Sequence, residues 1–242
     1  MPHIIGRQKN TLTIMRPFFL FILVIILTAG CSNPPLNNKI YTEGELDYNI
    51  IYPKQLNEHN STTFLPNEMI TYFKGDDVVM NIKGGFGLYH LKYISRAHGD
   101  TCFTLFKLFD KKMYFPMTNR QTLFFFKELG KPKIKLYEDS VKTIAGFKCK
   151  KAMISFPGSR IRSISAYYTQ EIGREHPNAN TPFEKIPGVL MEFNFFYKTL
   201  NFKVVAQKFS HVRIADPEFN VPAGYKETTQ KEIETLISTL LQ

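Results

Sequence analysis

The chain has 242 residues, of which 43% are hydrophobic and 14% aromatic, and its formal net charge is +10 at pH 7. This length suits one domain together with a targeting segment, and the three cysteines lack the paired spacing of a zinc site. The basic residues are scattered and accompany no recognisable nucleic-acid-binding module, which excludes nucleic acid as the expected partner.

The first thirty residues have the features of a secretory signal peptide. They contain Arg7, Lys9 and Arg16 but no acidic residue, and residues 18–30 form an uncharged run rich in Phe, Leu and Ile. This run is shorter than the roughly 20 residues that a membrane-spanning helix needs. We therefore expect a cleaved export signal and no permanent transmembrane helix.

The end of this signal resembles the lipobox of bacterial lipoproteins, Leu27-Thr28-Ala29-Gly30-Cys31. The chain would be cleaved before Cys31, and Cys31 would supply the thiol that receives diacylglycerol; several acyl chains together anchor a protein stably. The alternative is an ordinary secretory signal that contains a cysteine. The predicted organisation is a signal peptide over 1–30, a lipidated tether over 31–41 and a single β-rich domain over 42–242. No acidic cluster follows Cys31, which favours a periplasm-facing position in the outer membrane of a Gram-negative envelope.

The charge of the mature chain is lower than that of the precursor, because three of the basic residues belong to the signal. The remaining excess either keeps the protein soluble or faces anionic lipid headgroups.

A hydrophobic period of two dominates the first half of the mature chain and indicates β-strands. Residues 43–53 alternate cleanly, with Leu46, Tyr48 and Ile50 on the apolar side. Short apolar segments between turn residues predict further strands over 69–74, 78–82, 88–94, 102–109 and 112–117. Such a meander is typical of an antiparallel sheet.

The second half continues this pattern with two irregular regions. Residues 119–129 fit either a buried strand or a short helix, and residues 173–187 are rich in Pro and Asn. A loop of that length inside a compact domain is uncommon and often functional. Strands are predicted over 133–136, 145–156 (with a bulge at Lys150-Lys151), 161–172, 189–197 and 202–214.

The C-terminal region predicts an amphipathic helix. Thr229 and Glu232 fit a capping box, and apolar residues follow at helical spacing: Ile233, Leu236, Ile237, Leu240 and Leu241. Because this stripe needs an apolar surface, we expect the helix to cover the sheet. The predicted fold class is mainly β (α+β), a curved antiparallel sheet with a covering C-terminal helix.

The sequence contains no pattern that indicates catalysis or metal binding. It has no Gly-x-Ser-x-Gly element, and the glycine-rich turn at 84–87 lacks the Gly-Lys-Ser/Thr ending of a phosphate loop. The mature histidines do not have metal-ligand spacing: His59, His90, His98, His176 and His211. We therefore expect no enzymatic activity, no catalytic residues, no metal and no cofactor.

Two cysteines remain beyond Cys31, namely Cys102 and Cys149, and both lie in strand-like segments. An oxidising compartment permits a disulfide between them. Sequence spacing alone cannot distinguish a disulfide from two buried thiols, because it does not give the distance between the two backbones.

Aromatic content is the most distinctive feature of the mature chain, with 22 Phe and 12 Tyr but no Trp in the whole sequence. The strands at 102–109 and 189–197 are apolar on both faces, as expected where a sheet is covered or curls around a cavity. The aromatic residues either fill a core or line a concave site for an acyl chain or another apolar ligand. In the second case the expected ligand contacts are Phe106, Phe193, Phe195 and Tyr197.

Several segments resemble those of small uncharacterised Gram-negative envelope lipoproteins with a domain of unknown function. These segments are Gly44-Glu45-Leu46, 144–152, Tyr168-Thr169, 186–193 and 219–225. The stretch 186–190 is also similar to the motif of the GLPGLI family, although Lys185-Ile186 replaces the leading Gly-Leu. The resemblance covers most of residues 42–226. It implies a fold like that of the lipoprotein carriers LolA and LolB, a curved antiparallel half-barrel with a helical lid that holds acyl chains in its concavity.

The leading hypothesis is a non-catalytic periplasmic lipoprotein whose half-barrel binds a lipid or another apolar molecule. The alternative is an envelope interaction or structural protein, which would bind a partner protein through the loop 173–187 or through an exposed edge of the sheet.

Overall fold

The computed structural model describes residues 40–53, 65–118, 121–159, 163–198 and 200–240. The chain divides into two units, Met1–Asn37 and Asn38–Gln242, and the described residues all belong to the second. The predicted signal peptide (1–30), the lipidation site Cys31 and nearly all of the predicted tether (31–41) lie outside the described residues.

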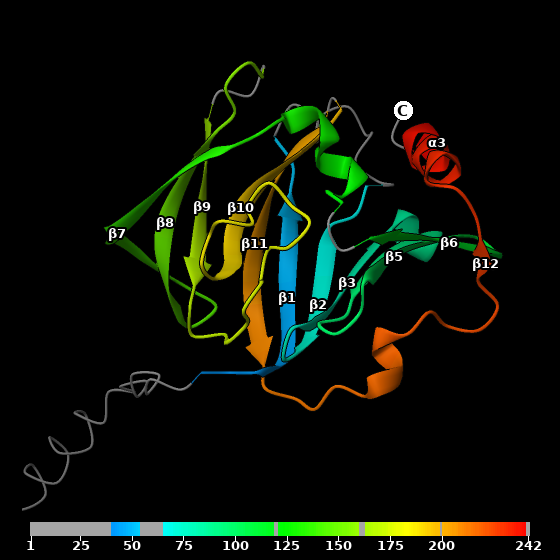
Figure 1. The fold of residues 1–242 in the computed structure, drawn as a ribbon, viewed down its shortest axis with the longest axis horizontal. Coiled ribbons are helices and arrows are strands. Elements are labelled where there is room, and N and C mark those ends of the chain that lie inside the picture. Colours follow the sequence, from blue (N-terminus) through cyan, green and yellow to red (C-terminus); the bar gives the residue numbers. More distant parts are fainter. Residues whose placement is uncertain (1–39, 54–64, 119–120, 160–162, 199, 241–242) are drawn as a thin grey trace, which may run out of the picture. The chain divides into compact units, whose positions relative to one another are not determined.

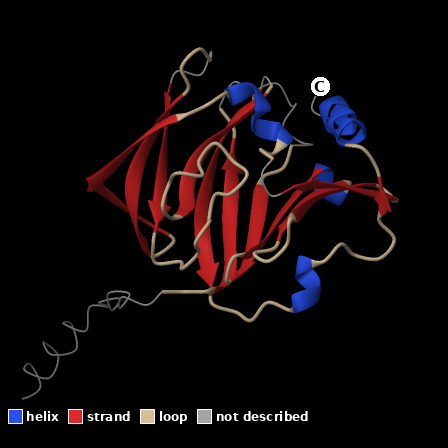
Figure 2. Cartoon of the chain, viewed as in Figure 1, coloured by secondary structure: helices blue, strands red, loops and turns tan. Residues whose placement is uncertain are grey.

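The described part of the chain is mainly β, with a single 12-stranded sheet and a C-terminal helix (Figures 1 and 2). This confirms the predicted fold class. The twelve strands are, in chain order, β1 (Glu43–Ile51), β2 (Glu68–Lys74), β3 (Asp77–Gly84), β4 (Tyr89–Ser95), β5 (Thr101–Leu108), β6 (Lys111–Thr118), β7 (Lys133–Ile144), β8 (Phe147–Ser155), β9 (Ser163–Thr169), β10 (Val189–Tyr197), β11 (Leu200–Ser210) and β12 (Lys226–Glu227). The helical segments are η1 (Gly85–Gly87), η2 (Phe124–Leu129), η3 (Asp216–Phe219) and α3 (Gln230–Leu240).

The strand order is β12-β6-β5-β4-β3-β2-β1-β11-β10-β9-β8-β7. It consists of two antiparallel meanders, β1 to β6 and β7 to β11, which are joined in the middle by the pairing of β1 with β11. Only β12 adds to the sheet in parallel, beside β6. Because β6 and β7 lie near opposite edges, the segment between them has to cross a whole face of the sheet, and this segment contains η2.

The predicted strands match the observed ones closely, with a few differences. The ambiguous region 119–129 contains a 3-10 helix, η2, and β11 ends at Ser210 instead of continuing to Ile214. β7 runs to Ile144 because a tight turn at Ala145 and Gly146, both with positive φ, returns the chain into β8. The irregularity predicted at Lys150-Lys151 lies on the opposite strand, where the register shifts between Tyr137 and Val141.

Strands β3 to β5 have buried residues on both faces, which the two-sided apolar sequence of 102–109 predicted for β5. Val79, Ile94 and Leu105 form a cluster with Ile214 and Phe219, which belong to the irregular segment that follows β11. This segment is held to the sheet by Lys74 with Asp216 at 2.6 Å and by Lys92 with Glu218 at 3.4 Å. Figure 1 shows it passing around the sheet towards β12 and α3.

The helix α3 therefore does not cover the outer face of the sheet. Its buried residues, Ile233 and Ile237, instead belong to a larger hydrophobic cluster on the other face of the sheet, here called the inner face, which includes Phe106 and Phe126. Lys111 at the start of β6 pairs with Glu232 at 2.7 Å, which fixes the helix beside that strand. Within the described ranges, no helix combines the length and the apolar character that crossing a membrane would require.

The predicted cap of α3 is present, since the backbone N–H of Glu232 donates to the hydroxyl of Thr229 at 3.2 Å. Replacing Thr229 by alanine is expected to lower the free energy of unfolding by about 1 kcal/mol, because one N-terminal amide loses its acceptor. Urea denaturation followed by circular dichroism measures this. The matched control is Thr235→Ala in the middle of the helix, which should change stability by less than about 0.5 kcal/mol. Equal losses at both positions would contradict a capping role.

Candidate functional site

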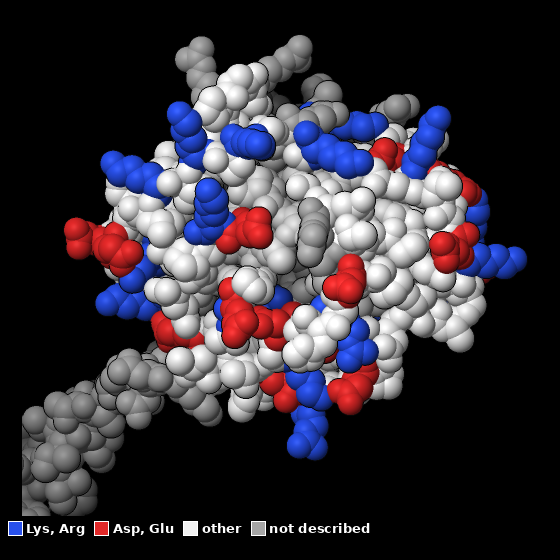
Figure 3. Space-filling model, in the orientation of Figure 1, with Lys and Arg blue, Asp and Glu red and all other residues white. Residues whose placement is uncertain are grey.

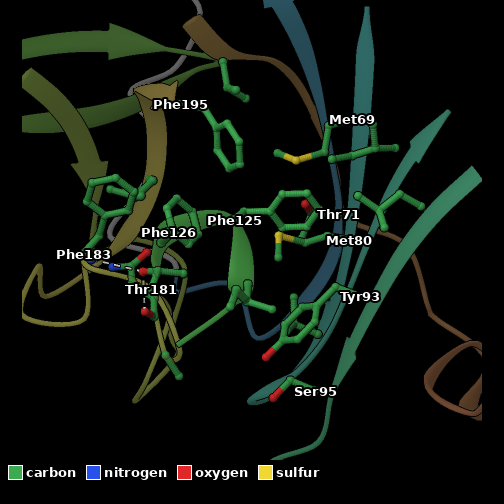
Figure 4. Close-up of a pocket in the computed structure, with 18 of the residues that line it drawn as sticks. Met69, Thr71, Met80, Tyr93, Ser95, Phe125, Phe126, Thr181, Phe183 and Phe195 are labelled. Atoms are coloured by element: carbon green, nitrogen blue, oxygen red, sulfur yellow. Dashed lines mark hydrogen bonds between the residues drawn. The ribbon is translucent and has the colours of Figure 1, made fainter. Parts of the chain in front are cut away.

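The inner face of the sheet encloses a cavity of about 610 Å³, within the range of roughly 300 to 1,000 Å³ that is typical of small-molecule sites. Its wall is built by β1 to β5, β10 and β11, and it is completed by η2, the loop after β9 and the end of α3. Figure 4 shows side chains from β2, β3, β4, β10, η2 and the loop after β9 converging on one space. The crossing segment between β6 and β7 thus passes over the inner face and closes part of it.

All four residues predicted as ligand contacts line this cavity: Phe106, Phe193, Phe195 and Tyr197. Phe106 comes from β5, whereas the other three come from alternate positions of β10. Phe195 stacks on Phe202 of β11, with ring centroids 4.9 Å apart. Their contact with a ligand stays a prediction.

The sequence did not identify the residues of η2 that complete the aromatic wall. The rings of Phe125 and Phe126 lie 6.0 and 5.1 Å from that of Phe195, measured between centroids, and Phe183 of the loop lies 5.8 Å from Phe126. The run Phe124-Phe125-Phe126 was the available signal. It indicated burial, but only the strand order shows which face of the sheet the run covers.

The loop 173–187, predicted as a functional region, forms one side of the cavity. Its buried Asn178 donates from Nδ2 to the carbonyls of Ile186 and Gly188, both at 2.9 Å. Asn180 has a positive φ of 64°, and its Nδ2 donates to the hydroxyl of Tyr93 on β4 at 2.8 Å. These two amides therefore hold the loop in one conformation against the sheet.

Replacing Asn178 by alanine is expected to lower the free energy of unfolding by about 2 kcal/mol, because two buried carbonyls lose their donor. Thermal melting and urea titration measure the loss. Asn201→Ala, at an exposed position of β11, is the control and should stay within about 0.5 kcal/mol of the wild type. If Asn178→Ala left the free energy of unfolding unchanged, this side chain would not be what fixes the loop.

Cys102 and Cys149 are both fully buried and are not joined to each other. The disulfide that the sequence left open is therefore absent from the structure. The physical reason is the strand order, because Cys102 lies on β5 and Cys149 on β8, which are separated by seven strands. Burial raises the pKa of the Cys149 thiol to about 12, and nearby carboxylates contribute to this while a backbone hydrogen bond opposes it.

The tyrosines of the cavity wall keep their hydroxyl protons. Burial raises the pKa of Tyr48, Tyr52 and Tyr93 well above the usual range. The hydroxyl of Tyr48 donates to the carbonyl of Leu190 at 3.0 Å, and that of Tyr52 donates to the carbonyl of Pro66 at 2.7 Å. These hydrogen bonds fix the tyrosine side chains in the cavity wall, and the neutral hydroxyls add no charge to it.

Charged side chains of both signs lie on the surface. On the face seen in Figure 3, Lys and Arg gather along the upper rim, while Asp and Glu lie mostly below them. Across the residues that the structure describes, no group of three or more His, Cys, Asp or Glu side chains could hold a metal ion.

No protein-family model matches the chain, and no curated protein matches it in sequence. Among solved structures, it is similar to the lipoprotein LppX of Mycobacterium tuberculosis, with 11% identity and a TM-score of 0.35 over 73% of this chain and 90% of that chain. It is also similar to LprF from Mycobacterium bovis, with 12% identity and a TM-score of 0.30 over 75% of this chain and 90% of that chain. The likeness to the GLPGLI family stays a prediction from the sequence. The chain thus has distant structural similarity to LppX and LprF, and no sequence family is assigned to it.

Proposed function

We propose that this chain is a non-catalytic lipoprotein of a Gram-negative envelope whose inner cavity binds a lipid or another apolar ligand. In this proposal the signal peptide 1–30 is removed, Cys31 carries the acyl chains, and residues 31–41 tether the domain 42–242 to the outer membrane on its periplasmic side. The basic and apolar regions of residues 1–30 and the lipobox support this address.

The single observation that carries the binding function is the cavity of about 610 Å³ with its largely apolar and aromatic wall. Atoms that line a void have no contact partners on one side and lose dispersion energy. A ligand with an alkyl chain restores those contacts, and each methylene transferred from water contributes roughly 0.8 kcal/mol. An apolar ligand therefore suits this wall better than a polar metabolite.

The position of the loop 173–187 favours ligand binding over the alternative of an interaction protein that uses this loop. Phe183 and Asn178 are buried and face the interior of the domain. The buried side chains of the loop therefore line the cavity. We propose that the loop forms part of the enclosure around the ligand.

The cavity is tested by measuring how tightly the neutral apolar dye N-phenyl-1-naphthylamine binds to the protein. The protein used is the full chain with the substitution Cys31→Ser, produced as a secreted protein. Met80 points into the cavity from β3 (Figure 4), and Met80→Trp should fill part of the space. We expect the variant to bind the dye about tenfold more weakly or worse, with an unchanged or higher melting temperature. Lys83→Trp, at an exposed position of the same strand, is the control and should bind like the wild type. Equal dye binding by Met80→Trp and the wild type, or no binding by either, would contradict the proposal.

The anchor is tested separately, by the intact mass of the protein recovered from the membranes of a Gram-negative host. We expect a chain that begins at Cys31 and carries acyl groups, whereas Cys31→Ser should appear in the soluble periplasmic fraction. A mature protein without acyl mass would refute the anchor but not the cavity.

A further inference from the structure

The cavity is chemically different at its two ends. Tyr52, Tyr89 and Phe202 lie where β1 ends and β4 begins, while Ser95 lies at the opposite end, beside the hairpin that joins β2 to β3. Figure 4 shows the hydroxyls of Tyr93 and Ser95 at a distance from Phe195, with Met80 between them. An elongated ligand would therefore meet aromatic side chains along one part of its length and polar groups at the other end.

Arg174 is the most buried charged group at this polar end, where Asp76, Arg96 and Glu175 also line the cavity. Its side chain is only 7% exposed, although guanidinium groups are rarely buried without partners. One terminal nitrogen donates to the carbonyl of Asp76 at 3.0 Å. Nε lies 3.9 Å from Oδ1 of Asp76, too far for a hydrogen bond, and has no hydrogen-bond partner among the described residues. Burial lowers the pKa of Arg174, whereas the charge of Asp76 raises it.

Thr104 supplies a second unsatisfied polar group in the same wall. It is 1% exposed and lies opposite Tyr93 in the β4–β5 ladder, and its hydroxyl has no hydrogen-bond partner among the described residues. A buried polar group without a partner is destabilising. Two of them beside one cavity indicate that something with oxygen acceptors completes this end.

The carboxylates near Arg174 leave its charge only partly compensated. Oδ1 of Asp76 also accepts the backbone N–H of Glu175 at 2.8 Å, and Asp77 pairs with Arg96 at 3.6 Å. Glu175 itself is exposed. A guanidinium is a planar fork of donors that matches a carboxylate in two hydrogen bonds, so an anionic head satisfies both the charge and the free donor.

The size of the cavity is sufficient for one long acyl chain. A methylene occupies about as much space as a water molecule, whose share of the liquid is roughly 30 Å³. A cavity of about 610 Å³ therefore holds on the order of 20 such groups, which corresponds to one long acyl chain and its head.

We propose that the polar end of the cavity is a carboxylate site, in which Arg174 and Thr104 bind the head of a single-chain fatty acid whose tail lies among Phe125, Phe193 and Phe195. This proposal rests on the proposed apolar binding function and adds the class and orientation of the ligand.

The test compares palmitate, methyl palmitate and hexadecanol as competitors of N-phenyl-1-naphthylamine on the full chain secreted with Cys31→Ser. We expect palmitate to bind about tenfold to a hundredfold more tightly than methyl palmitate, because only the acid presents a charged acceptor to Arg174. This comparison needs no substitution near the site. Equal affinities of the acid and its ester, with the dye still bound, would overturn the carboxylate site while leaving the apolar cavity intact.

The variants locate the site. Arg174→Met should abolish the preference for palmitate while dye affinity stays within about twofold, and Thr104→Val should reduce the preference. Arg96→Met removes an exposed arginine near the same end of the cavity, and it is the matched control that should keep the preference in full. A preference that survives in a folded Arg174→Met variant would overturn the assignment. If neither the dye nor any of the three ligands binds the wild type, the proposed function itself fails.

Discussion

Replacing Phe147 by alanine is expected to lower the free energy of unfolding by about 4 kcal/mol, the largest loss that we predict for a single substitution. Phe147 is 1% exposed at the start of β8. Its ring contacts Tyr41 and Phe209, with centroid separations of 5.8 and 5.1 Å. These partners lie before β1 and at the end of β11, so the side chain ties the second meander to the strands that join the two halves of the sheet.

The matched control is Phe193→Ala, at a half-buried position of the cavity wall. Because part of that ring faces the cavity and not packed atoms, its loss should cost about 1 to 2 kcal/mol. Urea denaturation of both variants, with shared baselines and slopes, measures the difference. Equal losses would mean that the wall at Phe193 is packed as densely as the core, which would also weaken the proposed binding function.

Glu192→Gln is expected to destabilise the protein by about 3 kcal/mol. The carboxylate of Glu192 is 8% exposed on β10 and is bound by Lys142 of β7 and Lys203 of β11, each at 2.5 Å. The glutamine amide has nearly the same shape as the carboxylate of Glu192, but it lacks the negative charge that pairs with both lysines. Glu138→Gln is the control, because Glu138 pairs with Lys150 at an exposed site of the edge strand, where ion pairs contribute less than about 1 kcal/mol.

The Glu192 cluster should also make stability depend on pH. Burial by itself raises the pKa of Glu192, but the hydrogen bonds and charges of Lys142 and Lys203 outweigh it and hold the pKa below 4.5. A carboxyl with a lowered pKa stabilises the fold fully above its unfolded pKa, and this contribution is lost as the pH falls through the folded value. The stability difference between the wild type and Glu192→Gln should therefore be constant above about pH 5 and shrink below it. A difference that grows on acidification would contradict this assignment.

Local patterns in the sequence were sufficient to predict most of the strands. The alternation of Leu46, Tyr48 and Ile50 gave β1 its buried face, and turn residues placed most of the strand ends within a few positions. The long-range arrangement could not be predicted in this way. Nothing in the residues around Leu46 shows that β1 pairs with β11, because that pairing depends on contacts more than 150 positions apart in sequence.

The same distinction applies to the site. Phe193 and Phe195 were predictable because they occupy alternate positions of a strand that is apolar on both faces. Arg174 was not, since an arginine at the start of a polar loop looks like a solvated residue. Its burial results from the return of the loop over the inner face, where it meets the hairpin at Asp76. The hydrophobic periodicity within one segment does not indicate which distant segment it will contact in the folded chain.

The open edges of the sheet have a consequence for self-association. β7 is an edge strand of twelve residues that is exposed along most of its length, and its free amide and carbonyl groups could template a strand from another molecule. Its charged side chains, among them Lys133, Lys135 and Glu138, and its register shift near Tyr137 make such addition unfavourable, while the other edge ends in β12, which has only two residues. Both edges of the sheet therefore disfavour the addition of strands from other molecules, even at high protein concentration. The sheet can thus remain open around its cavity without forming fibres.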